Sequence, residues 1–318
     1  MQIHYNLDNF IAVNPVVTIG TFDGVHLGHR EVISELKRIS ALSGGDSVVF
    51  TFEPHPRIVI APGEDSLRLL STKNEKIRLM EQLGIDHLVI YPFTIEFSKL
   101  SYNEFVTNIL VGKMNISSLV VGYDHRFGQG RKGDFNSLEY LSKALNFKVE
   151  QLSQLFVNSN VVSSTKIRQA LGTGDIAKAN NLLGYRYLLS GRVIEGKQLG
   201  RKLGFPTANI ETFENHKLVP GDGVYAVFVQ TGGKIYKGML NVGIRPTVNY
   251  NADHKSIEVH IFDFDSDIYN TEITLFFVQK IRDEQKFAGI VELKEQLIKD
   301  RINALGILSE EDIELALT

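Results

Sequence analysis

Two histidines three positions apart, His26 and His29, stand in the string Gly20-Thr-Phe-Asp-Gly-Val-His-Leu-Gly-His-Arg30. A β-branched segment, 15–19, precedes this string, and apolar residues at helical spacing follow it as far as Gly44. The pattern predicts strand, glycine-rich turn and helix, with both imidazoles on one side of the first helical turn. Because backbone N–H groups and the helix dipole attract anions at such a corner, these residues suit a triphosphate whose charge rises during reaction.

The histidine pair has two simpler explanations. A histidine near a helix start is commonly a capping or surface residue, and strand–Gly–helix openings are common in α/β folds. Two histidines with Asp23 could also begin a metal site, although such a site needs a third ligand near the pair. Spacing alone leaves both alternatives open.

Two more polar segments follow predicted strands of the first half. The strand predicted at 47–52 runs into Thr51-Phe-Glu-Pro-His-Pro56, where two prolines force an extended or turned backbone. The strand predicted at 117–122 runs into Gly122-Tyr-Asp-His-Arg-Phe-Gly-Gln-Gly-Arg-Lys-Gly133, which offers Arg126 to phosphates and aromatic rings to a flat ligand. Each segment could instead be a stiffened or solvated loop.

A third polar segment is Val162-Ser-Ser-Thr-Lys-Ile-Arg168. Ser164 or Thr165 is predicted to cap a helix there, and capping is a sufficient structural explanation for Ser164. Arg168 lies one turn further on. A structural role explains Arg168 less well, so it is a candidate for binding phosphate.

In the second half, four glycines and several basic residues precede a stiff Pro-Thr-Ala-Asn in the segment Gly191–Asn209. Backbone N–H groups of such a segment can wrap phosphates. Thr207 and Asn209 point the same way in an extended chain, and their oxygens suit Mg²⁺ already held by a nucleotide. Glu258 lies on one face of an alternating strand, where it could accept a hydroxyl proton. The alternatives are a glycine-rich hairpin with a buried polar pair, and a solvated glutamate.

The order of elements predicts an α/β chain with two domains. In residues 1–184 strands alternate with helices, which predicts a parallel, Rossmann-like sheet with helices on both faces and polar loops at one edge. In residues 185–318 short, evenly spaced strands predict an antiparallel β-barrel, followed by terminal helices. The predicted barrel strands are 187–195, 223–230, 234–242, 256–263 and 271–280, and the predicted helices start near Gly289 and at Ser309.

Composition narrows the class of protein. The 318 residues are 43% hydrophobic and 22% charged with net charge −3, which is ordinary for a globular protein and gives no general basic field for nucleic acid or membrane. The absence of cysteine excludes disulfides, thiol catalysis and Cys-ligated metals. The first residues lack a signal-peptide pattern and no stretch is long and apolar enough to span a bilayer, so we expect a cytoplasmic protein.

These motifs resemble one family. The string at Gly20–Arg30 resembles the HxGH signature of nucleotidyltransferases and looks like the FMN adenylyltransferase half of prokaryotic bifunctional riboflavin kinase/FAD synthetases. The spacing Ser164-x-x-x-Arg168 is similar to the second signature of that superfamily, whose loop closes over the ATP phosphates. The run into Pro-Thr-Ala-Asn209, then Glu258-Val-His and Ile281-Arg-Asp-Glu-Gln-Lys-Phe287, resembles the riboflavin kinase module. The resemblance covers nearly the whole chain in the family's module order.

The resemblance implies a role for each matching residue. Catalysis is expected of His26, His29, Arg168 and Glu258, and Mg²⁺ binding of Thr207 and Asn209. ATP or phosphate binding is expected of Gly20, Phe22, Asp23, Gly28, Ser164, Thr165, Gly196, Gly200, Arg201 and Gly204. Flavin binding is expected of Pro56, Asp124, Arg126 and Arg282.

The chain departs from the family pattern at three places. His125 replaces an aromatic residue, which weakens any ring stacking there. Tyr185-Arg186 replaces a sequence that usually contains proline, which affects the stiffness of the connection. Asn270 stands where relatives usually have glycine, and we predict a turn with positive φ there.

The expected activities are phosphorylation of riboflavin by ATP to FMN and adenylylation of FMN by ATP to FAD with release of pyrophosphate. ATP is the co-substrate, Mg²⁺ the cofactor, and no nucleic acid or membrane partner is expected. Two rival hypotheses are an adenylyltransferase for a pantetheine or nicotinamide nucleotide, and a flavin-binding protein without catalysis. The sequence leaves open a homo-oligomer, the relative rates of the two reactions, channelling of FMN and the redox state of the flavin.

Overall fold

The chain folds into two compact units. A computed structural model describes residues 1–61, 67–123, 126–153, 156–157, 160–196, 199–244 and 255–309. The first unit is Met1–Leu67 with Lys76–Val162, and the second is Arg68–Glu75 with Ser163–Thr318. The segment Arg68–Glu75 therefore leaves the first unit and belongs to the second.

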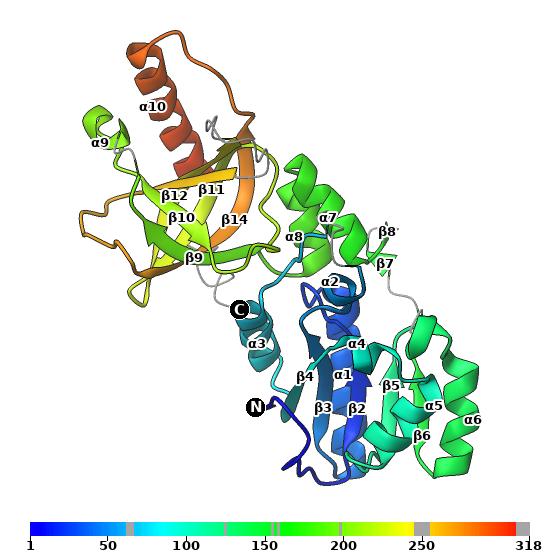
Figure 1. Cartoon of the computed structure of the whole chain (residues 1–318). Coiled ribbons are helices and arrows are strands. Elements are labelled where there is room, and N and C mark those ends of the chain that lie inside the picture. The colour runs from blue at the N-terminus through cyan, green and yellow to red at the C-terminus, as the bar shows by residue number, and fades with distance from the viewer. Residues whose placement is uncertain are drawn as a thin grey trace. The chain divides into compact units, whose positions relative to one another are not determined.

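A parallel sheet of six strands lies at the centre of the first unit (Figure 1), in the order β1-β4-β3-β2-β5-β6. The strands are β1 (Gln2–His4), β2 (Val16–Ile19), β3 (Ser47–Glu53), β4 (His87–Pro92), β5 (Ser118–Val121) and β6 (Lys148–Gln151). Since neighbouring strands run parallel, the carboxyl ends of β2, β3 and β5 share one edge of the sheet. The predicted parallel α/β fold is confirmed. β1 and β6 were not predicted because both are short and largely exposed, so they lack a continuous apolar run.

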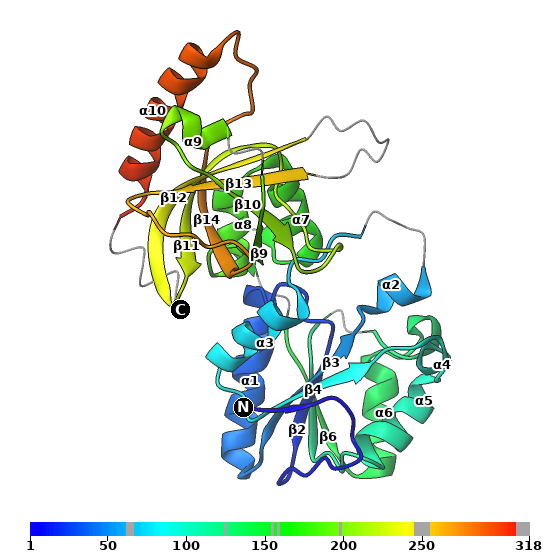
Figure 2. The same cartoon turned by 60° about the vertical axis from the view of Figure 1, so that its left-hand side comes forward.

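Helices cover both faces of this sheet, with α1 on one side and α4, α5 and α6 on the other (Figure 2). The central strands are buried on both faces, which explains why β2 is apolar apart from Thr18. The helical segments are α1 (Leu27–Ser43), α2 (Pro56–Ile60), α3 (Lys73–Gln82), α4 (Ile95–Ser98), α5 (Tyr102–Glu104), the π-helix η1 (Phe105–Val111), the 3₁₀ turn η2 (Gln129–Arg131) and α6 (Phe135–Leu145). A two-stranded ribbon, β7 (Phe156–Val157) with β8 (Asn160–Val161), follows.

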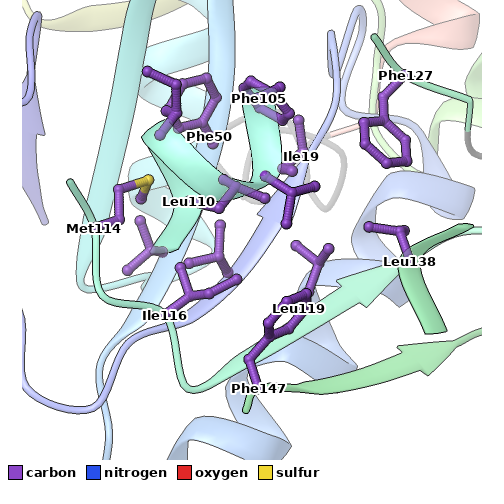
Figure 3. Close-up of a cluster of buried hydrophobic side chains, with 14 of the residues drawn as sticks. Ile19, Phe50, Phe105, Leu110, Met114, Ile116, Leu119, Phe127, Leu138 and Phe147 are labelled. Carbon is purple, nitrogen blue, oxygen red and sulfur yellow. The ribbon is translucent and has the colours of Figure 1, made fainter. Parts of the chain in front are cut away.

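One hydrophobic cluster fixes the helices of the second face to the strands (Figure 3). Ile19 and Phe50 come from β2 and β3, Phe105 and Leu110 from η1, and Leu138 from α6. All five side chains are less than a tenth exposed, so burial of this cluster is a main source of stability for the first unit. On the other face, Ile33, Leu36 and Ile39 of α1 are buried, which confirms the apolar side of the predicted helix.

The second unit contains a closed antiparallel barrel in the order β10-β13-β12-β11-β14-β9, which confirms the predicted barrel. Its strands are β9 (Leu188–Ile194), β10 (Ala208–Thr212), β11 (Gly223–Thr231), β12 (Lys234–Ile244), β13 (Lys255–Ile261) and β14 (Glu272–Arg282). β10 was missing from the predicted strands, because it has only five residues and follows Pro206-Thr207 directly. Leu240, Val242 and Val259 are fully buried, so they point into the barrel and their neighbours point outward.

In the described part of the second unit the helices are α7 (Ser164–Thr173), α8 (Ile176–Leu183), α9 (Leu199–Leu203) and α10 (Ile290–Ile307). α8 ends at Leu183, and Gly184 follows as its C-cap with φ +79°. Asn270 has φ +62°, which confirms the turn predicted there. The helix predicted from Ser309 lies outside the described residues.

Gly191 offers a test of the barrel's close strand packing. A Cβ on Gly191 would clash with the backbone carbonyl of Glu211 on β10, whereas a Cβ on Gly306 of α10 would meet nothing within 4 Å. We expect Gly191→Ala to lower the free energy of unfolding by about 1–3 kcal/mol and Gly306→Ala to raise it by up to about 1 kcal/mol. Urea unfolding followed by circular dichroism measures both, and equal midpoints for the two variants would contradict the register described here.

Candidate functional site

The turn between β2 and α1 holds an unusual backbone conformation. Phe22 has φ 46° and Val25 has φ 37°, and Gly24 between them has φ 81°. A β-branched residue rarely adopts positive φ, and such strain costs about 1–3 kcal/mol per residue. Hydrogen bonds across the turn hold it in place: Val25 N donates to Phe22 O (3.1 Å) and Gly20 N donates to Phe50 O (3.0 Å). Strain held in this way is characteristic of functional turns.

His26 and His29 follow this turn, and their side chains form a stacked pair. His26 is the N-cap of α1, and its Nδ1 accepts a hydrogen bond from His29 N (3.3 Å). The two rings are parallel, with centroids 3.6 Å apart and planes 13° apart. Phe22 meets the His29 ring edge-on at 5.1 Å. A Cβ on Gly28 would approach the His26 ring to 3.3 Å, which explains the glycine between the histidines.

The two imidazoles present hydrogen-bond donors rather than fixed positive charges. Because Nδ1 of His26 accepts a bond, the neutral ring carries its proton on Nε2, where it can donate to an oxyanion. The pKa of His29 lies well below the ordinary value of 6.5, first because the ring is buried and then because His26 and Lys76 repel a positive charge. Nδ1 of His29 is buried and has no hydrogen-bond partner in the structure. An unpartnered buried nitrogen in such a turn points to a ligand.

His26 caps α1, so one of the two simpler explanations for the histidine pair is confirmed. The metal alternative receives no support: within the part of the chain that is described, no group of three or more His, Asp or Glu side chains could hold a metal ion. Asp23 is almost fully buried beside the strained turn.

The other segments predicted in the first unit lie at carboxyl ends of strands. His55 caps the short helix α2 by accepting from Arg57 N (3.2 Å), and Pro56 is the first residue of that helix. Arg126 is exposed, with Nη1 3.7 Å from an oxygen of Asp134. Asp124 lies outside the described residues, as does His125.

The residues at 163–168 begin helix α7 in the second unit. The N-cap is Ser163, whose Oγ accepts from Lys166 N (3.4 Å), so the predicted cap at Ser164 or Thr165 is wrong by one or two positions. Three neighbouring hydroxyl residues make that position hard to assign from sequence. Arg168 is half-buried, and its Nε donates to the carbonyl oxygen of Arg68 (2.7 Å).

The barrel brings two of the predicted kinase residues, Asn209 and Glu258, together on one face of the sheet. Asn209 on β10 is directly opposite Glu258 on β13, and Glu258 is directly opposite Asn241 on β12. Opposed residues on one face lie with their Cβ atoms about 4.5–5.5 Å apart. Asn241 was not among the predicted site residues. The pairing register reveals it, because the sequence alone does not show which residues of two strands face each other.

Local backbone packing explains why glycines occur in the segment before β10. A Cβ on Gly196 would clash with the side-chain amide of Asn209, so the backbone passes directly over that amide. Gly200 accepts a hydrogen bond from Phe205 N (2.9 Å), and Gly204 has φ +84° at the end of α9. Arg201 is exposed on α9, a helix that was not predicted.

Arg282, which was predicted to contact the flavin, forms an ion pair within the protein. Its Nε and Nη2 donate to the fully buried carboxylate of Asp300 on α10 (3.0 and 2.7 Å). Its Nη1 donates to the carbonyl of Asp283 (2.9 Å). These bonds fix α10 against β14, which gives Arg282 a structural role in addition to any contact with a ligand.

Two family models match the chain, one for each kind of fold. The FAD synthetase model matches residues 11–166, which contain the parallel sheet and the histidine pair. The riboflavin kinase model matches residues 183–308, which contain the barrel. The fold and the sites therefore define a protein with a nucleotidyltransferase domain and a flavin kinase domain. No described helix is long and apolar enough to cross a membrane.

Relatives match almost from end to end. The bifunctional riboflavin kinase/FMN adenylyltransferase of Buchnera aphidicola is 39% identical, with 91% of this chain and 93% of that protein covered. Those of Bacillus subtilis and Escherichia coli are 38% and 37% identical, covering 92% and 94% of this chain and 92% and 95% of theirs. The chain belongs to the family of bifunctional riboflavin kinase/FMN adenylyltransferases.

Among solved structures, a Streptococcus pneumoniae protein titled a macrolide-efflux protein is similar. It has a TM-score of 0.85 and 30% identity, covering 94% of this chain and 97% of that one. This likeness extends to the fold of nearly the whole chain.

The lowered pKa of His29 predicts a pH dependence of stability. The unfolded chain takes up a proton at His29 near the ordinary pKa of 6.5, whereas the folded chain takes it up only at lower pH. The contribution of neutral His29 to stability is therefore complete above pH 7 and is lost as the pH falls below 6.5, with a slope of at most about 1.4 kcal/mol per pH unit. Urea midpoints between pH 5 and 8 should fall less steeply for His29→Gln. Parallel profiles for the two proteins would rule out the lowered pKa.

Proposed function

We propose that the chain carries out two consecutive reactions of flavin cofactor synthesis. The barrel, within residues 185–318, transfers the γ-phosphoryl group of ATP to riboflavin and forms FMN. The first domain, residues 1–184, joins FMN to the AMP part of ATP and forms FAD and pyrophosphate. The proposal rests above all on the match of both family models in this order along a chain that covers its relatives almost completely. A reaction that consumes ATP favours a cytoplasmic location.

In the kinase reaction, Glu258 acts as the general base. A hydroxyl is a poor nucleophile, and a carboxylate within hydrogen-bond reach can accept its proton as the new O–P bond forms. The ribityl 5′-oxygen then carries the phosphoryl group, and ADP leaves. Asn209 opposite Glu258 supports this role because it brings a polar amide to the face on which the glutamate lies.

Thr207 and Asn209 fit a magnesium ion that arrives with the nucleotide. Their neutral oxygens suit a hard cation whose other ligands are phosphates and water. Gly196 leaves the Asn209 amide a cradle that any Cβ would fill. When bound, Mg²⁺ would neutralise charge on the β- and γ-phosphates. The glycines and Arg201 before β10 would contact the same phosphates.

In the adenylyl transfer, the FMN phosphate attacks the α-phosphorus of ATP, and the bond to the β-phosphate oxygen breaks. The nucleophile is already an anion, so no general base is required. His26 and His29 donate hydrogen bonds to oxygens on which charge develops, and Arg168 balances charge on the leaving pyrophosphate. Gly20, Phe22, Asp23 and Gly28 shape the turn that would bind the ATP phosphates, and Ser164 and Thr165 offer hydroxyls and amides at the start of α7. Pro56, Asp124 and Arg126 are assigned to the flavin in this reaction, whereas Arg282 on the barrel is assigned to the flavin of the kinase reaction.

The first variant to make is His26→Ala. Loss of one preorganised donor costs on the order of 10²–10³ in kcat, so FAD formation from FMN should fall by about that factor. Phosphorylation of riboflavin should persist. Because His26 also caps α1, His26→Asn is the matched control: it restores a capping side chain but no imidazole. Recovery of FAD synthesis in His26→Asn would reduce the role of His26 to capping.

The kinase reaction has its own variant, Glu258→Gln, which keeps the size of the side chain but cannot accept the proton. Riboflavin phosphorylation should fall by about 10²–10⁴-fold. FAD formation from added FMN should continue at the wild-type rate and serves as the internal control. Unchanged FMN formation would exclude Glu258 as the base.

Chromatography of riboflavin incubated with the protein, ATP and Mg²⁺ tests the whole proposal. FMN should appear first and FAD after it, and chelation of the metal should stop FMN formation. FMN without FAD would leave the adenylyltransferase without support. Bound but unconverted riboflavin would favour a binding protein.

A further inference from the structure

The segment Arg68–Glu75 is separated in sequence from the rest of the second unit but is built into it. Leu69 forms a parallel β-bridge with Lys217. Leu69 N donates to His216 O (2.6 Å), and Leu218 N donates to Leu69 O (2.8 Å). The segment therefore lies as a short extra strand beside the loop between β10 and β11.

A buried ion pair fixes this segment. Lys217 Nζ lies 2.6 Å from Glu75 Oε2, and the two side chains are 0% and 2% exposed. The same ammonium donates to the carbonyl oxygens of Leu70 (2.7 Å) and Leu188 (2.8 Å), so it joins the segment to β9 as well. The Tyr187 ring lies 4.4 Å from the ammonium and completes its surroundings.

The carboxylate of Glu75 is equally well satisfied. Its Oε1 accepts from Ser190 N (2.8 Å) on β9, and its Oε2 accepts from Thr72 N (2.8 Å) in the segment itself. A buried ion pair stabilises a fold no better than apolar side chains of similar size, but it permits only one arrangement of its partners. Such a pair therefore suits a place where a precise position of the chain matters.

The Lys217–Glu75 ion pair fixes the position of Arg68, which begins the same segment. The carbonyl oxygen of Arg68 accepts the 2.7 Å hydrogen bond from Nε of Arg168 on α7. The loop that carries Lys217 also holds α7 directly, because Gly221 N donates to Leu171 O (2.8 Å). A Cβ on Gly221 would lie 2.5 Å from the carbonyl of Gly172, so only glycine allows this approach. One loop thus fixes both the donor and the acceptor of the Arg168 hydrogen bond.

We propose that Lys217 and Glu75 are positioning residues for adenylyl transfer: they hold Arg68, whose carbonyl orients the guanidinium of Arg168. This inference rests on the proposed role of Arg168. It gives Glu75 and Lys217 a function in adenylyl transfer, although Lys217 lies in the region matched by the riboflavin kinase model.

The test is Lys217→Met, which keeps the length of the side chain and removes its charge. FAD formation from FMN should lose on the order of 10²-fold in kcat, since small misplacements of a charge-stabilising group cost that much, with KM for FMN changed less. Riboflavin phosphorylation, measured on the same preparation, should stay within about threefold. Equal losses in both reactions would mean that the pair only supports folding, and the proposal would be wrong.

Lys143→Met is the control variant. It makes the same substitution in another lysine–carboxylate pair, Lys143 with Glu139 (3.3 Å), which lies on α6 and not on the loop or the segment that hold Arg168. Both reactions should proceed normally in this variant. If Lys217→Met does not fold, Glu75→Gln replaces it, because the amide oxygen can still accept from Ser190 N while the ion pair is lost.

A double-variant cycle separates this proposal from the role of Arg168. If Lys217 acts through Arg168, adding Lys217→Met to Arg168→Ala should cause no further loss of adenylyl transfer. Fully additive losses would overturn the positioning role. Full activity of Arg168→Ala would instead refute the assigned role of Arg168, whereas an inactive Arg168→Ala beside a fully active Lys217→Met would refute the positioning role alone.

Discussion

Strand pairing is the constraint on which both candidate sites depend. In the first unit, parallel pairing places the carboxyl ends of β2, β3 and β5 at one edge, so that loops distant in sequence meet there. In the barrel, the antiparallel register places Asn209 and Asn241 on either side of Glu258. A slip of one residue in either register would turn Glu258 toward the apolar interior. The buried side chains that fix the register, such as Leu240 and Val259, therefore also fix the chemistry.

The sequence was sufficient for the fold class and for most central elements. Continuous apolar runs predicted β2, β3 and β5, and short, evenly spaced strand-like segments predicted five of the six barrel strands, because burial of their apolar residues is what forms these strands. β10 was missed because it has only five residues and follows Pro206-Thr207 directly. α9 was missed because its five residues contain a glycine and give no periodic signal.

The candidate site was predictable as a set of residue types but not as an arrangement. The string around His26 and His29 indicated an anion site, yet nothing in it foretold stacked rings or the positive φ of Val25. Both result from tertiary packing, which local preferences do not encode. Likewise, no local pattern could connect Glu75 with Lys217, because their contact depends on how a segment leaves one unit and enters the other.

The two proposed reactions make opposite demands at the nucleophile. In the proposed kinase reaction a hydroxyl must lose a proton, and Glu258 is the carboxylate that we assign to accept it. In the proposed adenylyl transfer the phosphate has no proton to lose, and we assign His26 and His29 as hydrogen-bond donors. Burial lowers the pKa of His29 and thereby keeps the ring uncharged at neutral pH. An uncharged donor binds substrate and product phosphates less tightly than a cation does, which favours release of FAD and pyrophosphate. In the proposed mechanism Arg168 balances charge on the leaving pyrophosphate. The hydrogen bond from Arg168 Nε to the carbonyl oxygen of Arg68 then matters because it sets the direction of the guanidinium.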